Sequence, residues 1–203
     1  MAASEFVYLA SQSSRRRQLL DQLGLRYEML LADAVEDAEA LEQIHAGEAP
    51  ATYVTRVTAL KLGAALLRRK RRGLPAAPVL CADTTVAIGR QILGKPADAA
   101  EARAMLSLLS GRTHRVLTAV AVGTSAARSQ MLSVSRVSFA PMSARQISDY
   151  AASGEPLGKA GAYAVQGRGA TFISHISGSY SGIMGLPLFE TAQLLRSFKV
   201  KVW

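Results

Sequence analysis

Three short segments carry polar side chains where the core of an α/β protein would place apolar ones. In the first, Ser11, Ser13, Arg15 and Arg16 follow a short apolar run, at the start of an expected helix. Backbone N–H groups at a helix N-terminus favour an anion, and arginine can bind phosphate oxygens through two parallel hydrogen bonds. The segment therefore predicts a phosphate site. The alternative is a simple serine N-cap with the arginines in solvent.

The second segment, residues 79–86, places a carboxylate, Asp83, at the end of an otherwise apolar strand. A carboxylate there is costly unless it is paired, hydrogen-bonded or bound to a metal. Catalytic groups often occupy strand ends in α/β proteins. We therefore expect Asp83 to hold Mg²⁺, to orient a water molecule or to accept its proton. The alternative is an Asx turn that caps the strand.

The third segment, residues 89–96, is close to the phosphate-loop pattern GxxxxGK[ST]. Pro96 replaces the hydroxyl that should hold Mg²⁺ and has no N–H to donate to a phosphate. We therefore reject a phosphate-loop kinase or ATPase and keep Lys95 as a single cation for a phosphate. Elsewhere, the three histidines lack metal-ligand spacing, and the glycine-rich residues 158–169 do not form a dinucleotide-binding fingerprint.

The pattern of apolar residues predicts alternating strands and helices, with one hairpin-like pair of long strands. Strands are expected at residues 6–10, 27–32, 79–83 with a continuation to 88, 113–122, 131–139 and 170–176. Helices are expected from residue 13 or 14 to residue 23 and at residues 52–69, 98–110, 143–154 and 186–198. This order predicts an α/β fold with a mixed twisted sheet, flanking helices and two lobes around a central cleft. We treat residues 1–203 as a single domain.

The overall composition favours a globular protein with an affinity for anions. The net charge is +9, and five of the cations form one run, residues 68–72. That run is interpreted as the solvated end of a helix; a nucleic-acid patch is less favoured because no aromatic residues interleave with it. The single cysteine, Cys81, excludes an internal disulfide and is expected in the core. No signal sequence or membrane span is recognisable, so we expect a cytoplasmic protein.

Taken together, the motifs resemble the Maf family of nucleoside triphosphate pyrophosphatases. The motifs are collinear from about residue 8 to residue 195: LASxSxRR, ADTTV, ILGKP, LSGRTHRVLTAV, GKAGAYAVQG and GSYSGIMGLPL. The resemblance implies an elongated α/β fold with a cleft, a divalent cation (Mg²⁺ or Mn²⁺), and cleavage between the α- and β-phosphates. The AYAVQG and SYSGIMGLPL segments resemble the branch that acts on dTTP and UTP.

The resemblance also implies a role for individual residues. Asp83 matches the catalytic carboxylate and a metal ligand, and Asp37 most closely matches the family's second acidic residue, with Glu36 beside it as the alternative. Phosphate binding is implied for Ser11, Ser13, Arg15, Arg16, Lys61 and Lys95; base specificity is implied for Arg16, Thr84 and Gln166. The amide of Gln166 can donate and accept, which suits the uracil or thymine edge. Lys61 on its own resembles an ordinary surface lysine.

Two positions depart from the family pattern. Ser14 stands where the family usually has proline, and serine is tolerated at a first helical position. Leu60 stands where an acidic residue commonly precedes the lysine, which does not touch the chemistry directly. We expect a small loss from the first departure and none from the second.

The expected mechanism is in-line attack of water on the α-phosphorus, with the charge on the leaving pyrophosphate stabilised by the basic residues. The expected partner is a nucleoside triphosphate, with no membrane, and a homodimer is compatible with the sequence. Two rival functions are a nucleic-acid-binding protein, driven by the positive charge, and a nucleotide sensor without turnover. Neither requires acidic and basic groups in this collinear arrangement.

Overall fold

The computed structural model describes residues 4–33, 36 and 40–202. Within this part of the chain, seven strands form one sheet in the order β2-β1-β3-β5-β6-β7, and β4 pairs with the far end of β3. The strands are β1 (Val7–Leu9), β2 (Tyr27–Met29), β3 (Val79–Ile88), β4 (Gln91–Leu93), β5 (Thr113–Gly123), β6 (Arg128–Phe139) and β7 (Ile173–Ser177). β1 runs parallel to β2 and β3, and the other pairs are antiparallel. The predicted mixed sheet and the β5–β6 hairpin are confirmed.

Six α-helices and three short 3-10 segments accompany the sheet in the described residues. The helices are α1 (Ser14–Gln22), α2 (Pro50–Arg71), α3 (Ala99–Leu109), α4 (Ala144–Ala152), α5 (Tyr180–Met184) and α6 (Leu188–Ser197), and the 3-10 segments are η1 (Ala40–Glu42), η2 (Ala160–Ala162) and η3 (Arg168–Phe172). Side-chain caps explain several of the starts, since Ser13, Asp98 and Ser143 each accept a hydrogen bond from a first-turn N–H.

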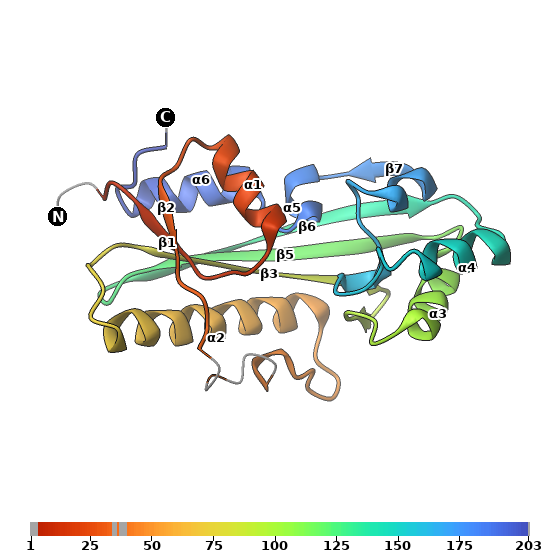
Figure 1. Cartoon of the computed structure of the whole chain (residues 1–203), viewed down its shortest axis with the longest axis horizontal. Helices are drawn as coiled ribbons and strands as arrows, with labels where there is room; N and C mark the ends of the chain where they lie inside the picture. The colour runs from red at the N-terminus through yellow and green to blue at the C-terminus, as the bar shows by residue number, and fades with distance from the viewer. Residues whose placement is uncertain (1–3, 34–35, 37–39, 203) are drawn as a thin grey trace.

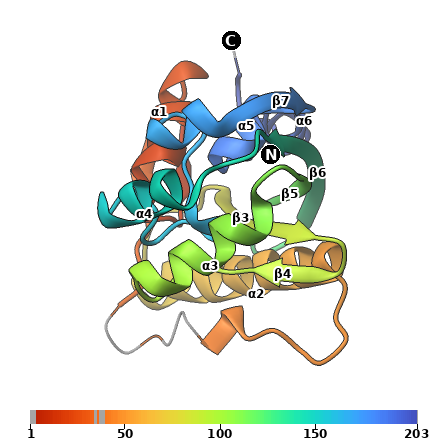
Figure 2. The same ribbon diagram turned by 90° about the vertical axis from the view of Figure 1, so that its right-hand side faces the viewer.

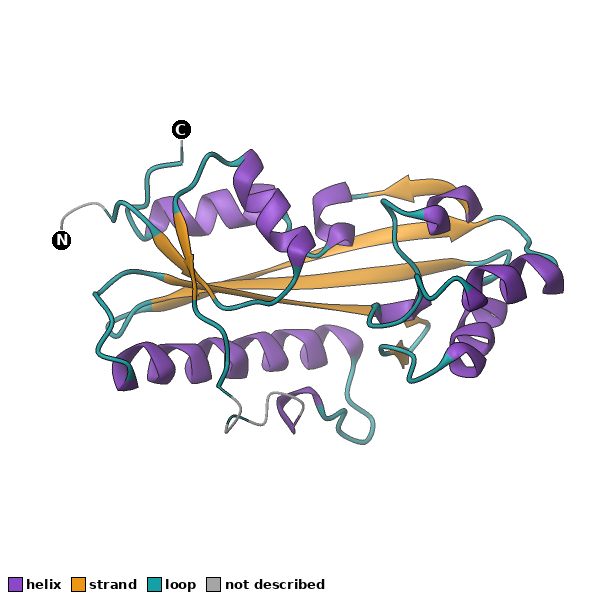
Figure 3. Ribbon diagram, in the orientation of Figure 1, coloured by secondary structure: helices purple, strands orange, loops and turns teal. Residues whose placement is uncertain are grey.

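The helices cover the two faces of the long strands unequally. α2 packs along β3 and β5 on one face, while α5 and α6 pack on β5 and β6 on the other. Figure 1 shows these layers, and Figure 2 shows the same sandwich from one end, with α3 and α4 nearest the viewer. Short elements gather at the two ends of the long central strands (Figure 3). Along β3 and β5, buried apolar side chains therefore lie on both faces of the sheet.

Alternation along β3 decides which side chains face which layer. Cys81 packs with the α2 cluster, whereas Ala82 and Val86 belong to the cluster on the opposite face. Successive strand residues point to opposite faces, so Asp83 faces α2 and its neighbour Thr84 faces α5. The expectation that Cys81 is a core residue is confirmed, with 1% of its surface exposed.

Several predicted boundaries were wrong. Asp83 is not at a strand end, because β3 continues unbroken to Ile88. The strand expected at 27–32 covers only residues 27–29, and the one expected at 170–176 begins at Ile173 after a 3-10 turn. The last helix starts at Leu188, with Pro187 as its N-cap and not in its first turn. β4 was not predicted at all, because its three residues carry no pattern of their own.

Across the residues described, none of the helices combines the length and the apolar character that a membrane span needs.

Candidate active site

A cleft opens where the edge of β3 has no neighbouring strand. β1 pairs with β3 only at Val79 and Leu80, and β4 pairs with it only from Val86 onward. In the described structure, residues 81–85 therefore have an open edge on that side, and a cavity of about 950 Å³ lies against it. Because the edge is open, side chains from both faces of β3 can reach the cavity. Asp83 and Thr84 both line it.

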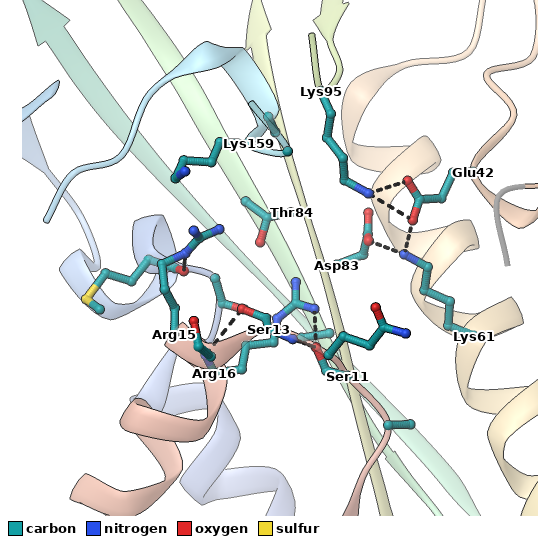
Figure 4. Close-up of a pocket in the computed structure, with 18 of the residues that line it drawn as sticks. Ser11, Ser13, Arg15, Arg16, Glu42, Lys61, Asp83, Thr84, Lys95 and Lys159 are labelled. Atoms are coloured by element: carbon teal, nitrogen blue, oxygen red, sulfur yellow. Dashed lines mark hydrogen bonds and ion pairs between the residues drawn. The ribbon is translucent and has the colours of Figure 1, made fainter. Parts of the chain in front are cut away.

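One wall of the cleft carries two carboxylates, which Lys61 bridges, and a second lysine that contacts one of them (Figure 4). Lys61 Nζ lies 2.5 Å from Asp83 Oδ1 and 2.6 Å from Glu42 Oε1. Lys95 Nζ lies 3.0 Å from Glu42 Oε2. Burial opposes ionisation of Glu42, but the adjacent Lys61 and Lys95 hold the pKa of its carboxyl below the usual value. The four groups balance in charge.

The facing wall is the start of α1. Arg16 donates from Nε to the carbonyl of Gly185 at 2.7 Å and from Nη1 to Ser11 Oγ at 3.0 Å. Arg15 donates to the carbonyl of Met184 at 3.2 Å. Ser13 is the N-cap of the helix and accepts from the Arg16 amide. These contacts fix both guanidinium groups beside the N–H groups of a helix start, as an anion site requires.

The charge on this second wall is not balanced by acidic side chains. Within the described chain, neither Arg15 nor Arg16 forms an ion pair with a carboxylate. Burial lowers the pKa of Arg15, and burial together with Arg15 lowers that of Arg16 while Asp83 counteracts the effect. Lys159 also lines the cleft, and its pKa is lowered by burial and by Arg15. This wall therefore favours a multiply charged anion.

A hydrogen-bonded chain holds Thr84 at the back of the cleft. Thr84 Oγ1 lies 2.9 Å from Thr118 Oγ1, and Thr118 donates onward to the carbonyl of Gly182 at 2.7 Å. Gln166 reaches the cleft from the opposite loop and is exposed there. Arg16, Thr84 and Gln166 thus surround one cavity although they are far apart in the sequence.

Comparison with known proteins identifies the family. The model of the family described as "Maf-like protein" matches residues 6–198. The chain belongs to the Maf family. It is 73% identical over 98% of its length to the whole of a protein from Albidiferax ferrireducens named dTTP/UTP pyrophosphatase. Proteins of the same name from Polaromonas sp. and Cupriavidus metallidurans are 67% and 66% identical over 100% and 95% of this chain, which covers 100% and 96% of theirs.

The described residues that the Maf resemblance singled out converge on this cleft. Ser11, Ser13, Arg15, Arg16, Lys61, Asp83, Thr84, Lys95 and Gln166 all line it. Asp37, expected as the second metal ligand, lies outside the described residues. Its neighbour Glu36 binds Arg68 at 2.8 and 2.5 Å, and these hydrogen bonds help to lower the pKa of Glu36 to about 2.

Glu42 and Lys159 were not found by sequence reasoning. Glu42 lies in a polar stretch without periodicity, so nothing distinguishes it from its acidic neighbours. Lys159 belongs to the GKAG motif, which was interpreted only as a loop that allows close approach. That motif was the available signal, because a lysine beside glycines in a cleft loop has room to contact a ligand.

The two carboxylates suit a divalent cation. Asp83 and Glu42 both contact the ammonium of Lys61, so their carboxylates lie close enough to act on one cation. Carboxylate oxygens are the ligands that Mg²⁺ and Mn²⁺ prefer. In the described residues no group of three or more acidic, histidine or cysteine side chains gathers. A cation here would therefore take its remaining ligands from phosphate oxygens and water, as Mg²⁺ usually does.

Proposed function

We propose that this chain hydrolyses dTTP and UTP to the nucleoside monophosphate and pyrophosphate. The observation that carries the proposal is the arrangement across the cleft: a carboxylate wall suited to a metal faces an arginine-rich helix start suited to phosphates. The names of the high-identity relatives support the same reaction and substrates. We propose that the chain acts as one catalytic domain in the cytoplasm.

In the proposed reaction, Asp83 accepts a proton from the attacking water. The oxygen of the water forms a bond to the α-phosphorus. The bond between that phosphorus and the oxygen that links it to the β-phosphorus breaks, and pyrophosphate leaves. Asp83 is set for this task because Lys61 holds Oδ1 at 2.5 Å, while no described residue donates a hydrogen bond to Oδ2. The second oxygen can therefore face the water.

Basic side chains stabilise the phosphates. Arg15 and Arg16 are fixed by the carbonyls of Met184 and Gly185, so they need no reorganisation when charge moves onto the leaving pyrophosphate. Ser11 and Ser13 add hydroxyls, and Lys61 and Lys95 add cations on the opposite wall. A divalent cation held by Asp83 and Glu42 would neutralise phosphate charge and lower the pKa of a bound water.

We assign base recognition to Arg16, Thr84 and Gln166. The exposed amide of Gln166 offers both a donor and an acceptor to the O4/N3 edge of a pyrimidine. Thr84 is fixed through Thr118, so its hydroxyl presents a constant hydrogen-bonding direction. A site that must satisfy such polar groups rejects bases that leave them unpaired.

Asp83→Asn tests the assignment directly. The amide keeps the shape but cannot accept a proton, so we expect kcat for pyrophosphate release from dTTP to fall by about 10²–10⁴-fold. The control is Asp149→Asn, which changes an exposed acid on α4. Wild-type turnover in Asp83→Asn would exclude Asp83 as the base. Nucleotide binding by the wild type without pyrophosphate release would instead indicate a sensor.

A further inference from the structure

Tyr150 and Glu155 hold the backbone on both sides of Gln166. On the N-terminal side, the amide of Ala164 donates to Tyr150 Oη at 3.3 Å. On the C-terminal side, the amide of Gly169 donates to Glu155 Oε1 at 3.1 Å. Tyr150 Oη in turn donates to Glu155 Oε1 at 2.8 Å, so the two side chains act as one clamp. The clamp fixes the residue two before Gln166 and the residue three after it.

The charge of Glu155 makes this clamp strong. Its second oxygen, Oε2, accepts a hydrogen bond from the Arg168 amide at 3.0 Å. Burial opposes ionisation of Glu155, but the amides of Arg168 and Gly169 hold the pKa of its carboxyl below the usual value. Burial and the adjacent Glu155 raise the pKa of Tyr150, so the phenol keeps its proton and remains a donor. Hydrogen bonds to an ionised acceptor are about twice as strong as neutral ones.

Two glycines leave the space that the clamp occupies. A Cβ on Gly167 would lie 2.6 Å from Glu155 Cδ, and a Cβ on Gly169 would lie 2.7 Å from Tyr150 Oη. Neither glycine has a positive φ, so the backbone conformation itself would admit other residues. Their small size is needed for the approach of Glu155 and Tyr150, which ties the glycines of the QGRG stretch to the clamp.

The segment is also anchored one step earlier, while Gln166 is left to face the cleft. Tyr163 Oη lies 2.9 Å from His114 Nε2 in the core. Ala164 and Val165 are buried, whereas Gln166 is exposed. The side chain of Gln166 makes no hydrogen bond to any described residue, so its donor and acceptor stay available to a ligand. The backbone is therefore immobilised around one free amide.

We propose that Tyr150 and Glu155 are positioning residues for base recognition. They do not line the cleft, and they act by holding Gln166 where its amide meets the pyrimidine edge. This inference rests on the proposed function, because it takes Gln166 to contact the base. It adds that selectivity depends on two side chains beyond the reach of the nucleotide.

A double-mutant cycle tests whether Glu155 acts on base selectivity through Gln166. The variants are Glu155→Gln, Gln166→Ala and the double variant, assayed with dTTP, with dATP and with inorganic triphosphate, which has no base. Glu155→Gln would turn the NH₂ group of the new amide toward backbone N–H donors, which it cannot accept from. We therefore expect the preference for dTTP over dATP to fall on the order of tenfold, mainly through a higher KM for dTTP. We expect no further loss of preference when Glu155→Gln is added to Gln166→Ala. Hydrolysis of inorganic triphosphate should keep the wild-type rate.

If Glu155→Gln does not fold, two milder variants still test the proposal. Tyr150→Phe removes a single hydroxyl, and Gly167→Ala pushes a methyl group against the Glu155 carboxylate. Both should lower the same preference. The matched controls are Tyr180→Phe at an exposed tyrosine and Gly63→Ala on α2, where a Cβ would meet its nearest neighbouring atom at 3.7 Å. Thermal melting checks that each variant is folded.

Two results would overturn the positioning role. One is a loss that is equal for dTTP, dATP and inorganic triphosphate. The other is a Glu155→Gln effect that is undiminished in the Gln166→Ala background, which would indicate general destabilisation. If the wild type releases pyrophosphate, either of these results refutes only this inference and leaves the proposed function standing. A wild type that releases no pyrophosphate from any nucleotide would refute the proposed function, and the inference with it.

Discussion

Glu42 is the residue whose assignment the structure changes most. It is partly buried and contacts both Lys61 and Lys95, and it shares Lys61 with Asp83. A carboxylate that remains ionised beside the catalytic candidate is suited to complete a metal site. The acidic partner of Asp83 in our proposal is therefore Glu42; Asp37, which the sequence indicated with Glu36 as the alternative, lies outside the described residues.

Replacing Glu42 should weaken metal binding. We expect Glu42→Gln to raise the Mg²⁺ concentration for half-maximal dTTP hydrolysis by about 10–100-fold, because a neutral amide binds a hard cation less well than a carboxylate. The measurement is the rate of pyrophosphate release against Mg²⁺ concentration. Glu28→Gln, at an exposed position on β2, is the control. A larger shift in Asp37→Asn than in Glu42→Gln would return the role to Asp37.

For single residues, the sequence indicated what chemistry a side chain could perform better than it indicated which other residues that side chain contacts. Asp83 was recognisable because a lone carboxylate interrupts an apolar strand. Lys61 was not, because a lysine on a helix resembles any solvated lysine until the fold places it 2.5 Å from Asp83. Glu42 comes from a stretch with no periodicity, so its position depends on how residues 40–49 return to α2. Such contacts between distant segments leave no local trace in the sequence.

At the scale of elements, one ion-pair group ties the segment after β2 to α2. Arg68 is buried on α2 and donates to both oxygens of Glu36 and to the carbonyl of Leu30. Arg71 and Arg72 pair with Asp33 on the same segment. Most of the basic run at the end of α2 is therefore engaged in contacts within the chain, with Arg68 buried and Arg71 and Arg72 paired at the surface. This weakens the nucleic-acid interpretation, which needed these cations to be free.

Glu36→Gln should destabilise this junction. Arg68 would keep its burial but lose a charged partner, so we expect the free energy of unfolding at pH 7 to fall by about 2 kcal/mol. The folded pKa of Glu36 is about 2, below the usual 4.5. The stabilisation that the ionised Glu36 gives to the folded state is therefore complete above about pH 4.5 and is lost as the pH falls toward 2.

Urea unfolding of wild type and Glu36→Gln at pH 7 and pH 3 measures this effect. The difference between the two proteins should be smaller at pH 3 than at pH 7. Glu5→Gln, at an exposed acid, should unfold like the wild type at both values. A difference that does not change with pH would contradict the ionised pair.

Elements with local signals were predictable, and those stabilised by packing were not. The Ser143–Gln146 capping box and the Asp98 cap are present as the sequence indicated. The predicted last helix is preceded by a separate short helix, α5, because Gly185 adopts a left-handed conformation and ends α5. β4 exists because the turn after Ile88 folds its three residues back on β3. Three residues are too few for a pattern, so only the pairing defines the strand.

At the scale of the whole molecule, the net charge of +9 acts on an anionic substrate over distances longer than any contact. In the cleft, the charges on one wall cancel, whereas the other wall holds Arg15, Arg16 and Lys159. The local electrostatic field therefore attracts the triphosphate toward the start of α1. Exposed cations elsewhere add a longer-range attraction. Salt screens this attraction over about 10 Å at 0.1 M, whereas groups within the cleft are screened less.

We therefore expect salt to change substrate capture and leave the chemical step unaltered. Between roughly 0.02 and 0.2 M KCl, kcat/KM for dTTP should fall several-fold while kcat stays constant. A variant with the exposed Lys70, Arg103 and Lys201 changed to Glu should show a lower kcat/KM at low salt and a shallower salt dependence. Its kcat should match the wild type, because these residues lie outside the cleft. An unchanged salt dependence in this variant would show that the cleft cations alone attract the nucleotide.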